Sequence, residues 1–219
     1  MTVIAIDGPA GAGKTTIARG GADALGWDYV DTGAMYRAIT LGALRGGVDP
    51  ADAVAVEEVA RDAQIVSAGR AISLDGEDVS EAIRAADVTH TVPIVAAHAG
   101  VRATLVELQR EAARTRDVVM EGRDIGSVVV PDAPVKVFLT ASLEERARRR
   151  TGELGLEPSG DGLAGMEARI AERDAADSTR EASPLQRAAD AVEIDTTGRS
   201  IEDITREIVA LATERLDAR

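Results

Sequence analysis

The sequence predicts an α/β fold with a five-stranded parallel sheet flanked by helices. Short apolar runs of the kind that parallel sheets bury alternate with longer segments of helical periodicity. The chain begins in the order strand, helix, strand, helix, and this order favours a parallel sheet. A glycine-rich segment directly behind the first strand predicts that ligands bind at the carboxyl edge of the sheet.

Apolar patterning predicts where the strands and helices lie. The predicted strands of the sheet cover residues 3–7, 27–31, 118–121, 135–139 and 192–195. The predicted helices cover residues 16–25, 34–45, 51–62, 80–90, 101–114, a segment from 142 through 150, a segment that holds residues 169–180, and 200 to about 215. In the helix over 101–114, Leu105, Leu108 and Ala112 are spaced to share one face. Ser142 and Glu145 stand at capping-box distance.

Three short extended segments interrupt the α/β order. They cover residues 64–67, 70–74 and 77–79, and Asp75-Gly76 between the last two is a strong hairpin signal. We therefore expect residues 63–80 to form a small antiparallel insertion that projects from the core. A stretch rich in glycine, proline and serine that ends near residue 165 predicts a flexible loop between two arginine-bearing helices.

Composition indicates a single soluble domain over residues 1–219. The chain has 45% hydrophobic residues and no cysteine, and no apolar run approaches the roughly 20 residues of a membrane helix. Its net charge of −13 argues against binding to nucleic acid or anionic membranes, because both attract basic surfaces. The N-terminus lacks a signal-like segment, so we expect a cytoplasmic protein. We also expect a monomer whose partners are small molecules.

The segment from Gly8 to Thr16 matches the phosphate-binding P-loop pattern G-x-x-x-x-G-K-[ST]. Its residues are Gly8, Pro9, Ala10, Gly11, Ala12, Gly13, Lys14, Thr15 and Thr16. Glycines let backbone N–H groups converge on phosphate oxygens, and the following helix adds the positive end of its dipole. Lys14 can supply a charge to the β- and γ-phosphates of ATP, and the Thr15 hydroxyl can ligate Mg²⁺.

Other predicted strands deliver polar residues to the same edge of the sheet. Residues 31–37 follow the second strand, and Arg123 with Asp124 follows the strand over 118–121. Arg123 and Asp124 could form a structural ion pair or a turn, or they could govern Mg²⁺ or substrate binding. The sequence alone leaves both interpretations open.

Arginine is concentrated in two predicted helices. The four arginines within residues 146–150 could be a solvated helix face, or part of a mobile lid that neutralises charge on a transferring phosphoryl group. Arg173, Asp177 and Arg180 lie at i, i+4 and i+7, on one side of a predicted helix. They could pair with one another or face a nucleotide.

Four segments resemble the bacterial cytidylate kinases, a family of P-loop nucleoside monophosphate kinases, and the resemblance covers essentially the whole chain. The segments are Ile6-Asp7-Gly8 through Lys14; Asp31-Thr32-Gly33-Ala34-Met35-Tyr36-Arg37; Glu121-Gly122-Arg123-Asp124-Ile125-Gly126-Ser127-Val128-Val129; and Arg173-Asp174 through Asp177-Ser178 and Arg180 to Ser183-Pro184-Leu185. The last three are more specific than a P-loop. The resemblance implies the nucleoside monophosphate kinase fold and transfer of the γ-phosphoryl group of ATP, with Mg²⁺, to CMP or dCMP.

The resemblance also implies roles for individual residues. Thr32, Arg102 and Asp124 match positions around the cytosine ring; Arg37, Arg123 and Arg180 match positions that hold the monophosphate; Arg173 and Asp177 match contacts to the sugar; and Tyr36 belongs to the same CMP site. The residues expected to act in catalysis are Lys14, Arg123, Asp124 and Arg149, the last as a lid arginine. Residues 63–84 match the monophosphate-binding insertion, and residues 149–165 match the Arg-rich lid. Pro93 stands where the family has a serine that helps to bind the sugar.

Three other functions remain compatible with a P-loop. The first is a kinase of another small acceptor, such as UMP or dephospho-coenzyme A. The second is a GTPase switch, which is disfavoured because neither Lys14 nor Lys136 follows an asparagine, as the guanine-selective motif requires. The third is an ATP-hydrolysing interaction protein.

Overall fold

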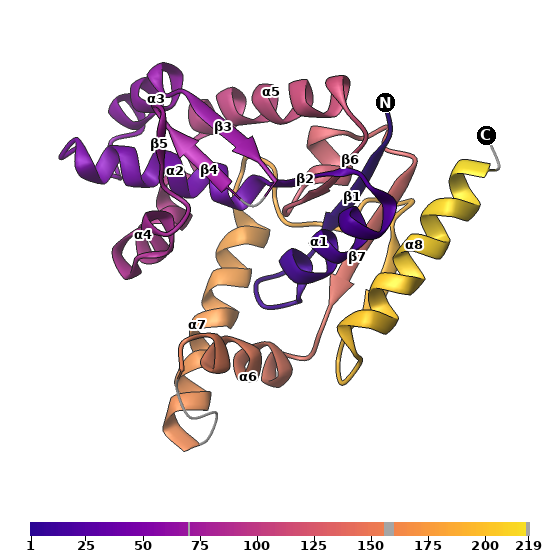
Figure 1. Cartoon of the computed structure of the whole chain (residues 1–219). Coiled ribbons are helices and arrows are strands. Elements are labelled where there is room, and N and C mark those ends of the chain that lie inside the picture. The colour runs from indigo at the N-terminus through magenta and orange to yellow at the C-terminus, as the bar shows by residue number, and fades with distance from the viewer. Residues whose placement is uncertain (70, 156–159, 218–219) are drawn as a thin grey trace.

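Five parallel strands form the central sheet of the computed structural model, which describes residues 1–69, 71–155 and 160–217. Their order across the sheet is β2 (Asp28–Asp31), β6 (Val118–Glu121), β1 (Val3–Asp7), β7 (Val135–Thr140) and β8 (Val192–Asp195). All four neighbouring pairs are parallel, so the predicted sheet is confirmed (Figure 1). Strand β1 lies at the centre, between β6 and β7.

The side chains of β1 alternate between two apolar layers. Ile4 and Ile6 belong to the layer under α1 (Lys14–Leu25) and α8 (Ile201–Asp217), which lie side by side in Figure 1. Val3 and Ala5 belong to the layer under α2 (Thr32–Arg45) and α5 (Ala99–Thr115). Because both faces are covered, every residue of the strand is buried, and this explains the continuous apolar run in the sequence.

The predicted antiparallel insertion forms a separate three-stranded sheet. Strands β3 (Ile65–Ala68), β4 (Ala71–Leu74) and β5 (Glu77–Asp78) pair in that order. Asp75 and Gly76 both have positive φ, at 52° and 84°, as a two-residue hairpin turn requires. Residue 70, which the sequence assigns to the middle strand, lies outside the described residues.

The helix predicted over residues 80–90 is wrong as a single element. The chain forms a short 3-10 helix, η1 (Ala82–Arg84), and then α4 (Ala86–Val95), with extended ψ of 153° at Ala85. Ile83 and Val88 both reach the core, and a spacing of five residues does not return a helix to the same face. The break at Ala85 lets both side chains be buried.

The flexible loop predicted to run to residue 165 is wrong from residue 160 onward. Helix α6 (Leu143–Glu153) is followed by α7 (Gly160–Thr179), and residues 156–159 lie outside the described residues. Met166 and Ile170 of α7 are buried against Ala147 of α6, so packing overrides the poor helix propensity of this glycine-rich segment. Arg180 lies one residue beyond the end of α7, not within it as predicted.

Three smaller features complete the fold. Helix α3 (Ala53–Asp62) packs against α5, and a π-helical turn that the sequence did not predict, η2 (Ile125–Val129), follows β6. Helix α5 buries Leu105 fully but leaves Leu108 39% exposed, so the predicted shared face is wrong for Leu108. No helix within the described ranges is long and apolar enough to cross a membrane.

The burial of α5 predicts different costs for two leucines on one helix. Leu105→Ala should lower the free energy of unfolding by about 2–5 kcal/mol, because it leaves a cavity in the core. Leu108→Ala should change it by no more than about 0.5 kcal/mol, because the side chain remains partly in solvent. Urea unfolding of both variants checks this difference. Equal losses would contradict the orientation of α5.

Candidate active site

The P-loop joins β1 to α1 at the carboxyl edge of the sheet. Gly8 has φ of 149°, and a Cβ atom at this position would lie 2.2 Å from the carbonyl oxygen of Leu139. Gly13 precedes α1 with left-handed φ of 88°. Both positions therefore require glycine, and the pattern in the sequence follows from backbone sterics.

Lys14 lies inside this loop with its ammonium group buried. Its Nζ donates a hydrogen bond to the carbonyl oxygen of Pro9 at 2.8 Å. Burial, and then the charge of Arg123, lower the pKa of Lys14 to about 7, whereas the charge of Glu121 acts in the opposite direction. In the free protein, burial and a neighbouring cation therefore disfavour the charged form of Lys14, as expected where an anion is to bind.

Glu121 is a buried residue of this edge that the sequence-based list of site residues omits. Its carboxylate accepts a hydrogen bond from the hydroxyl of Tyr29, and its backbone oxygen accepts one from Thr32 Oγ1 at 2.6 Å. Burial, and then the charge of Asp31, raise the pKa of Glu121, whereas Lys14 lowers it. The neighbouring Thr15 hydroxyl also lowers the pKa of Glu121. Glu121 directly precedes Gly122 and Arg123, and this position could have indicated a site residue. The sequence pattern assigns Glu121 only to the end of a strand.

Arg123 and Asp124 do not pair with each other. Asp124 Oδ2 accepts a hydrogen bond from Arg102 Nη2 at 2.5 Å, and both side chains are buried. Arg123 Nε donates to Asp177 Oδ2 at 2.9 Å. The interpretation of the two neighbours as a mutual structural ion pair is therefore wrong, because the chain turns their side chains in different directions.

Residues from three helices, and Arg180 just beyond the end of α7, form a polar cluster with Asp124. Arg180 Nη2 lies 3.9 Å from Asp124 Oδ1, and Arg180 Nη1 lies 3.6 Å from Asp177 Oδ1. The guanidinium carbon of Arg102 lies 5.2 Å from the ring centroid of Tyr36. Burial is the largest cause that raises the pKa of Tyr36 to about 12. Helices α2, α5 and α7 thus contribute to one polar cluster beside the end of β6.

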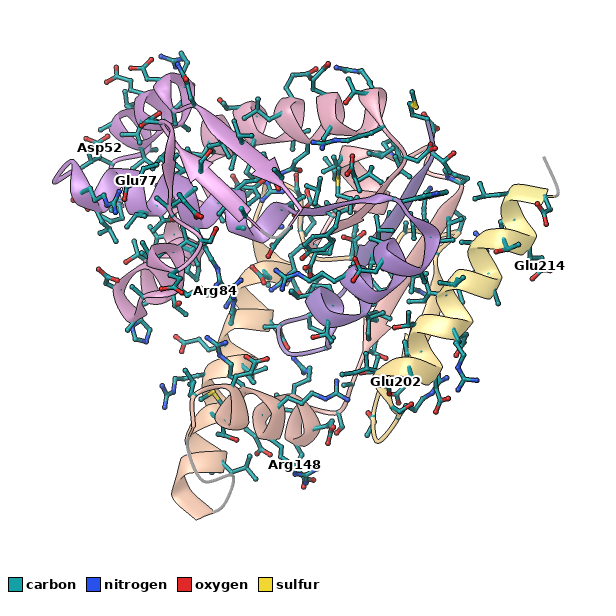
Figure 2. All side chains as sticks on the ribbon, viewed as in Figure 1. Asp52, Glu77, Arg84, Arg148, Glu202 and Glu214 are labelled. Carbon is teal, nitrogen blue, oxygen red and sulfur yellow. The ribbon has the colours of Figure 1, made fainter. Side chains whose placement is uncertain are left out.

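Several arginines of the site lower one another's pKa. Burial, and then the charge of Arg123, lower the pKa of Arg173 to about 10, although Asp177 opposes this shift. Burial likewise lowers the pKa of Arg37, and the charges of Arg150, Arg84 and Arg123 contribute to this effect. Figure 2 labels Arg84, which together with Arg150 is absent from the sequence-based list of site residues. Cations held this close together favour a bound anion.

The arginine run in α6 has three different environments. Arg149 donates to Thr196 Oγ1 at 2.9 Å, to the Thr196 carbonyl oxygen at 2.7 Å and to Glu145 at 3.0 Å. Arg146 is buried, donates to the Ala10 carbonyl oxygen of the P-loop at 3.2 Å and pairs with Asp174. Arg148 is half exposed on the outer side of α6, where it pairs with two glutamates (Figure 2). The solvated-face interpretation holds for Arg148 and is wrong for Arg146.

The predicted residues lie toward one edge of the sheet, and the side chains of two of them have distinct environments. Thr16 is exposed at the start of α1. Thr32 is buried at the start of α2, and its hydroxyl is already bonded to the backbone of Glu121. Lys14, Thr15, Arg123, Asp124, Asp177 and Arg180 are linked through the contacts described above. The arrangement combines a phosphate loop with a second anion site whose walls also hold carboxylates.

Comparison with known proteins identifies relatives along the whole chain. The family model described as cytidylate kinase matches residues 4–214. A cytidylate kinase of Mycobacterium leprae is 49% identical over 217 residues, covering 99% of this chain and 97% of the relative. A cytidylate kinase of Desulfitobacterium hafniense is 50% identical over 217 residues, covering 98% and 94%. A gluconokinase structure from Sinorhizobium meliloti has a TM-score of 0.54 at 15% identity, covering 99% of this chain and 95% of that one, and it shares the fold.

The lowered pKa of Lys14 predicts proton uptake when a triphosphate binds. A bound anion should return the pKa toward its ordinary value near 10.5, so at pH 8 the complex should gain up to about one proton. Affinity for Mg·ATP should accordingly fall as pH rises above about 7. Calorimetric titration at pH 8 in HEPES and in Tris measures the uptake, and Lys14→Met should lose it. Equal heats of binding, corrected for dilution, in both buffers for the unsubstituted protein would contradict the prediction.

Proposed function

The chain belongs to the cytidylate kinase family, and on that premise we propose that it transfers the γ-phosphoryl group of ATP to CMP or dCMP. The products are ADP and CDP or dCDP, and the reaction belongs to pyrimidine nucleotide metabolism. One observation carries the proposal: beside the buried pair of Arg102 and Asp124, Arg180 lies within 3.9 Å of Asp124 and shares Asp177 with Arg123. A phosphate acceptor with a polar base fits this combination of charges.

The donor side is the P-loop. The backbone N–H groups of the P-loop, to which Pro9 contributes none, and the ammonium group of Lys14 bind the β- and γ-phosphates of ATP. Mg²⁺ bound with ATP would neutralise phosphate oxygens, and the Thr15 hydroxyl would be its protein ligand. The nearness of the Thr15 hydroxyl to the buried Glu121 carboxylate supports this assignment, because a carboxylate beside that hydroxyl would favour a divalent cation there.

The acceptor side distinguishes cytosine by its hydrogen-bonding edge. Cytosine presents an amino donor at N4, which the Asp124 carboxylate accepts, and Arg102 donates to the adjacent ring acceptors. Uracil presents a carbonyl oxygen at the same position, which would face the carboxylate without a proton between them. Thr32 and Tyr36 complete the base site. The buried Arg102–Asp124 hydrogen bond at 2.5 Å supports this assignment because it holds both groups in place before substrate arrives.

Arginines bind the remaining charges of the acceptor. Arg37, Arg123 and Arg180 hold the monophosphate, and Arg173 with Asp177 contacts the sugar. An oxygen of the acceptor phosphate attacks the γ-phosphorus of ATP in line with the departing ADP oxygen, and the protein contributes alignment and charge neutralisation. Lys14, Arg123 and Arg149 neutralise the transferring group, while Asp124 aligns the acceptor. The position of Arg123, between the Asp177 carboxylate and the charge of Lys14, supports its role at the junction of the two sites.

We further propose that residues 1–219 form one kinase domain, with an acceptor insertion over 63–84 and a lid over 149–165. Closure of the lid would exclude water, which could otherwise accept the phosphoryl group. The nearness of Arg149 to Gly13 supports the lid role, because its Nη1 lies 3.6 Å from the position of a Cβ atom there. We propose a cytoplasmic monomer without nucleic-acid or membrane partners, and the net charge of −13 supports the absence of such partners.

Recognition of the ribose 2′-hydroxyl is a separate question, because Pro93 has no side-chain donor. Pro93 lies inside α4, where the sequence comparison with the family led us to expect a serine. We propose that the chain discriminates little between CMP and dCMP at this position. Comparing kcat/KM for the two acceptors measures the discrimination directly.

The base assignment predicts a specific change in acceptor preference. Asp124→Asn should lower kcat/KM for CMP by about 100-fold, because the acceptor for N4 is lost. Activity with UMP should change less, since the new amide can donate to the uracil carbonyl. A coupled assay with ATP and CMP, dCMP, UMP and AMP measures all four.

Asp132→Asn, an exposed aspartate in the loop that follows η2, is the matched control and should leave every acceptor unchanged. If the unsubstituted protein turned over UMP or AMP as well as CMP, the alternative of a kinase for another acceptor would replace this proposal. ATP hydrolysis indifferent to any acceptor would instead favour an ATP-hydrolysing interaction protein.

A further inference from the structure

The first amide groups of η2 are capped by a residue from far along the chain. Asp7 Oδ1 accepts a hydrogen bond from the backbone N–H of Ile125 at 2.8 Å, and Asp7 Oδ2 accepts one from Gly126 at 2.8 Å. Asp7 is the buried last residue of β1 and directly precedes the P-loop. One carboxylate therefore satisfies two amides that the turn itself leaves without partners.

Asp124 holds the position from which this turn would ordinarily be capped. Aspartate is among the preferred residues there, and its side chain normally accepts from an amide in the first turn. The Asp124 side chain makes no such bond and instead pairs with Arg102. Because Asp7 already occupies the Gly126 amide, the Asp124 carboxylate cannot take that amide as its own capping partner.

We propose that Asp7 is a positioning residue, which acts as a substitute cap for η2 and thereby keeps the Asp124 carboxylate turned toward Arg102. The consequence for acceptor recognition rests on the proposed function, in which Asp124 reads the base. The same residue ends the strand that carries the P-loop. Asp7 therefore ties the donor loop and the acceptor carboxylate to a single point of the sheet.

The bond pattern explains why an aspartate is needed at position 7. Asparagine has the same shape but only one acceptor oxygen, so its NH₂ group would face one of the two amide donors. Burial is the largest cause that raises the pKa of Asp7 to about 6, and the two amide bonds act against that shift. The carboxylate is thus retained at an electrostatic cost that its two hydrogen bonds partly offset.

The opposite side of η2 is also fixed. A Cβ atom on Gly126 would lie 3.2 Å from Cδ of Lys136 and 3.5 Å from Asp7 Oδ2. The Lys136 ammonium is bonded to Asp190 at 2.8 Å, so its stem has little freedom to move aside. Gly126 therefore lies between Asp7 and a restrained lysine, and this keeps its amide within reach of the Asp7 carboxylate.

A double-mutant cycle tests whether Asp7 acts through Asp124. We expect Asp7→Ala to raise KM for CMP at least tenfold and to change KM for ATP by less than about threefold. In the Asp124→Ala background, adding Asp7→Ala should change KM for CMP by less than about twofold. Asp7→Asn should fall between the unsubstituted protein and Asp7→Ala. If Asp7 had a purely structural role, the fold-changes in KM for CMP caused by the two single substitutions would multiply in the double variant. That result would overturn the proposal.

Asp52→Ala is the matched control. Asp52 caps α3 by accepting from the amides of Val54 and Ala55, both at 3.1 Å, and it lies on the far side of the insertion (Figure 2). Its loss should lower stability without changing KM for CMP in either background. A change in KM for CMP comparable to that of Asp7→Ala would mean that general loss of stability produces the effect, and would overturn the proposal.

A crystal structure of Asp7→Ala without nucleotide tests the inference independently of the reaction. The Asp124 carboxylate should then turn to the Gly126 amide and leave Arg102, whereas an unchanged Arg102–Asp124 bond would overturn the proposal. If Asp7→Ala does not fold, the crystal structure and the cycle use Asp7→Asn. A protein that prefers another acceptor would refute the proposed function, while the crystal structure would still decide the role of Asp7.

Discussion

The parallel pairing of β1 with β6 is the interaction on which the rest of the site depends. Ile6 lies opposite Glu121, and the amide of Gly122 donates to the Ile6 carbonyl oxygen at 3.0 Å. The carboxyl ends of the two strands therefore lie side by side at the same edge of the sheet. One continues into the phosphate loop and the other into the segment that holds Arg123 and Asp124. A shift of this register would move the two half-sites apart, because each loop leaves the sheet directly from one of these two strands.

The site concentrates positive charge in a protein whose net charge is −13. Removing guanidinium groups from water is costly, and a buried ion pair is weak as a source of stability. The carboxylates of Asp124 and Asp177 offset part of the cost, since each contacts two arginines. The charge that remains uncompensated is what a phosphate group can neutralise. The arrangement is thus better explained by binding than by stability.

Neighbours in sequence differ in what they do. Arg146 supports the P-loop through Ala10, Arg149 reaches Thr196 at the end of the sheet, and Arg148 lies outside with glutamate partners. The helix distributes one repeated residue type over three environments because successive positions point about 100° apart. The run of arginines in the sequence therefore does not indicate which environment each arginine has. Only the packing of α6 against α7 and the P-loop distinguishes one arginine from another.

The sequence by itself determined the elements whose cause is local. Short apolar segments predict the five strands of the sheet, Asp75-Gly76 predicts a hairpin, and the spacing of glycines predicts the P-loop. The family motifs also identified nearly all of the polar residues that the structure gathers at the sheet edge. Only the tertiary structure decided the partners: Asp124 with Arg102, Arg123 with Asp177, and Asp7 with the amides of η2. It also decided the break at Ala85, the start of α7 and the exposure of Leu108. These features depend on which surfaces meet after the sheet has formed, and torsional preferences of neighbouring residues do not encode contacts between positions as distant as 7 and 125.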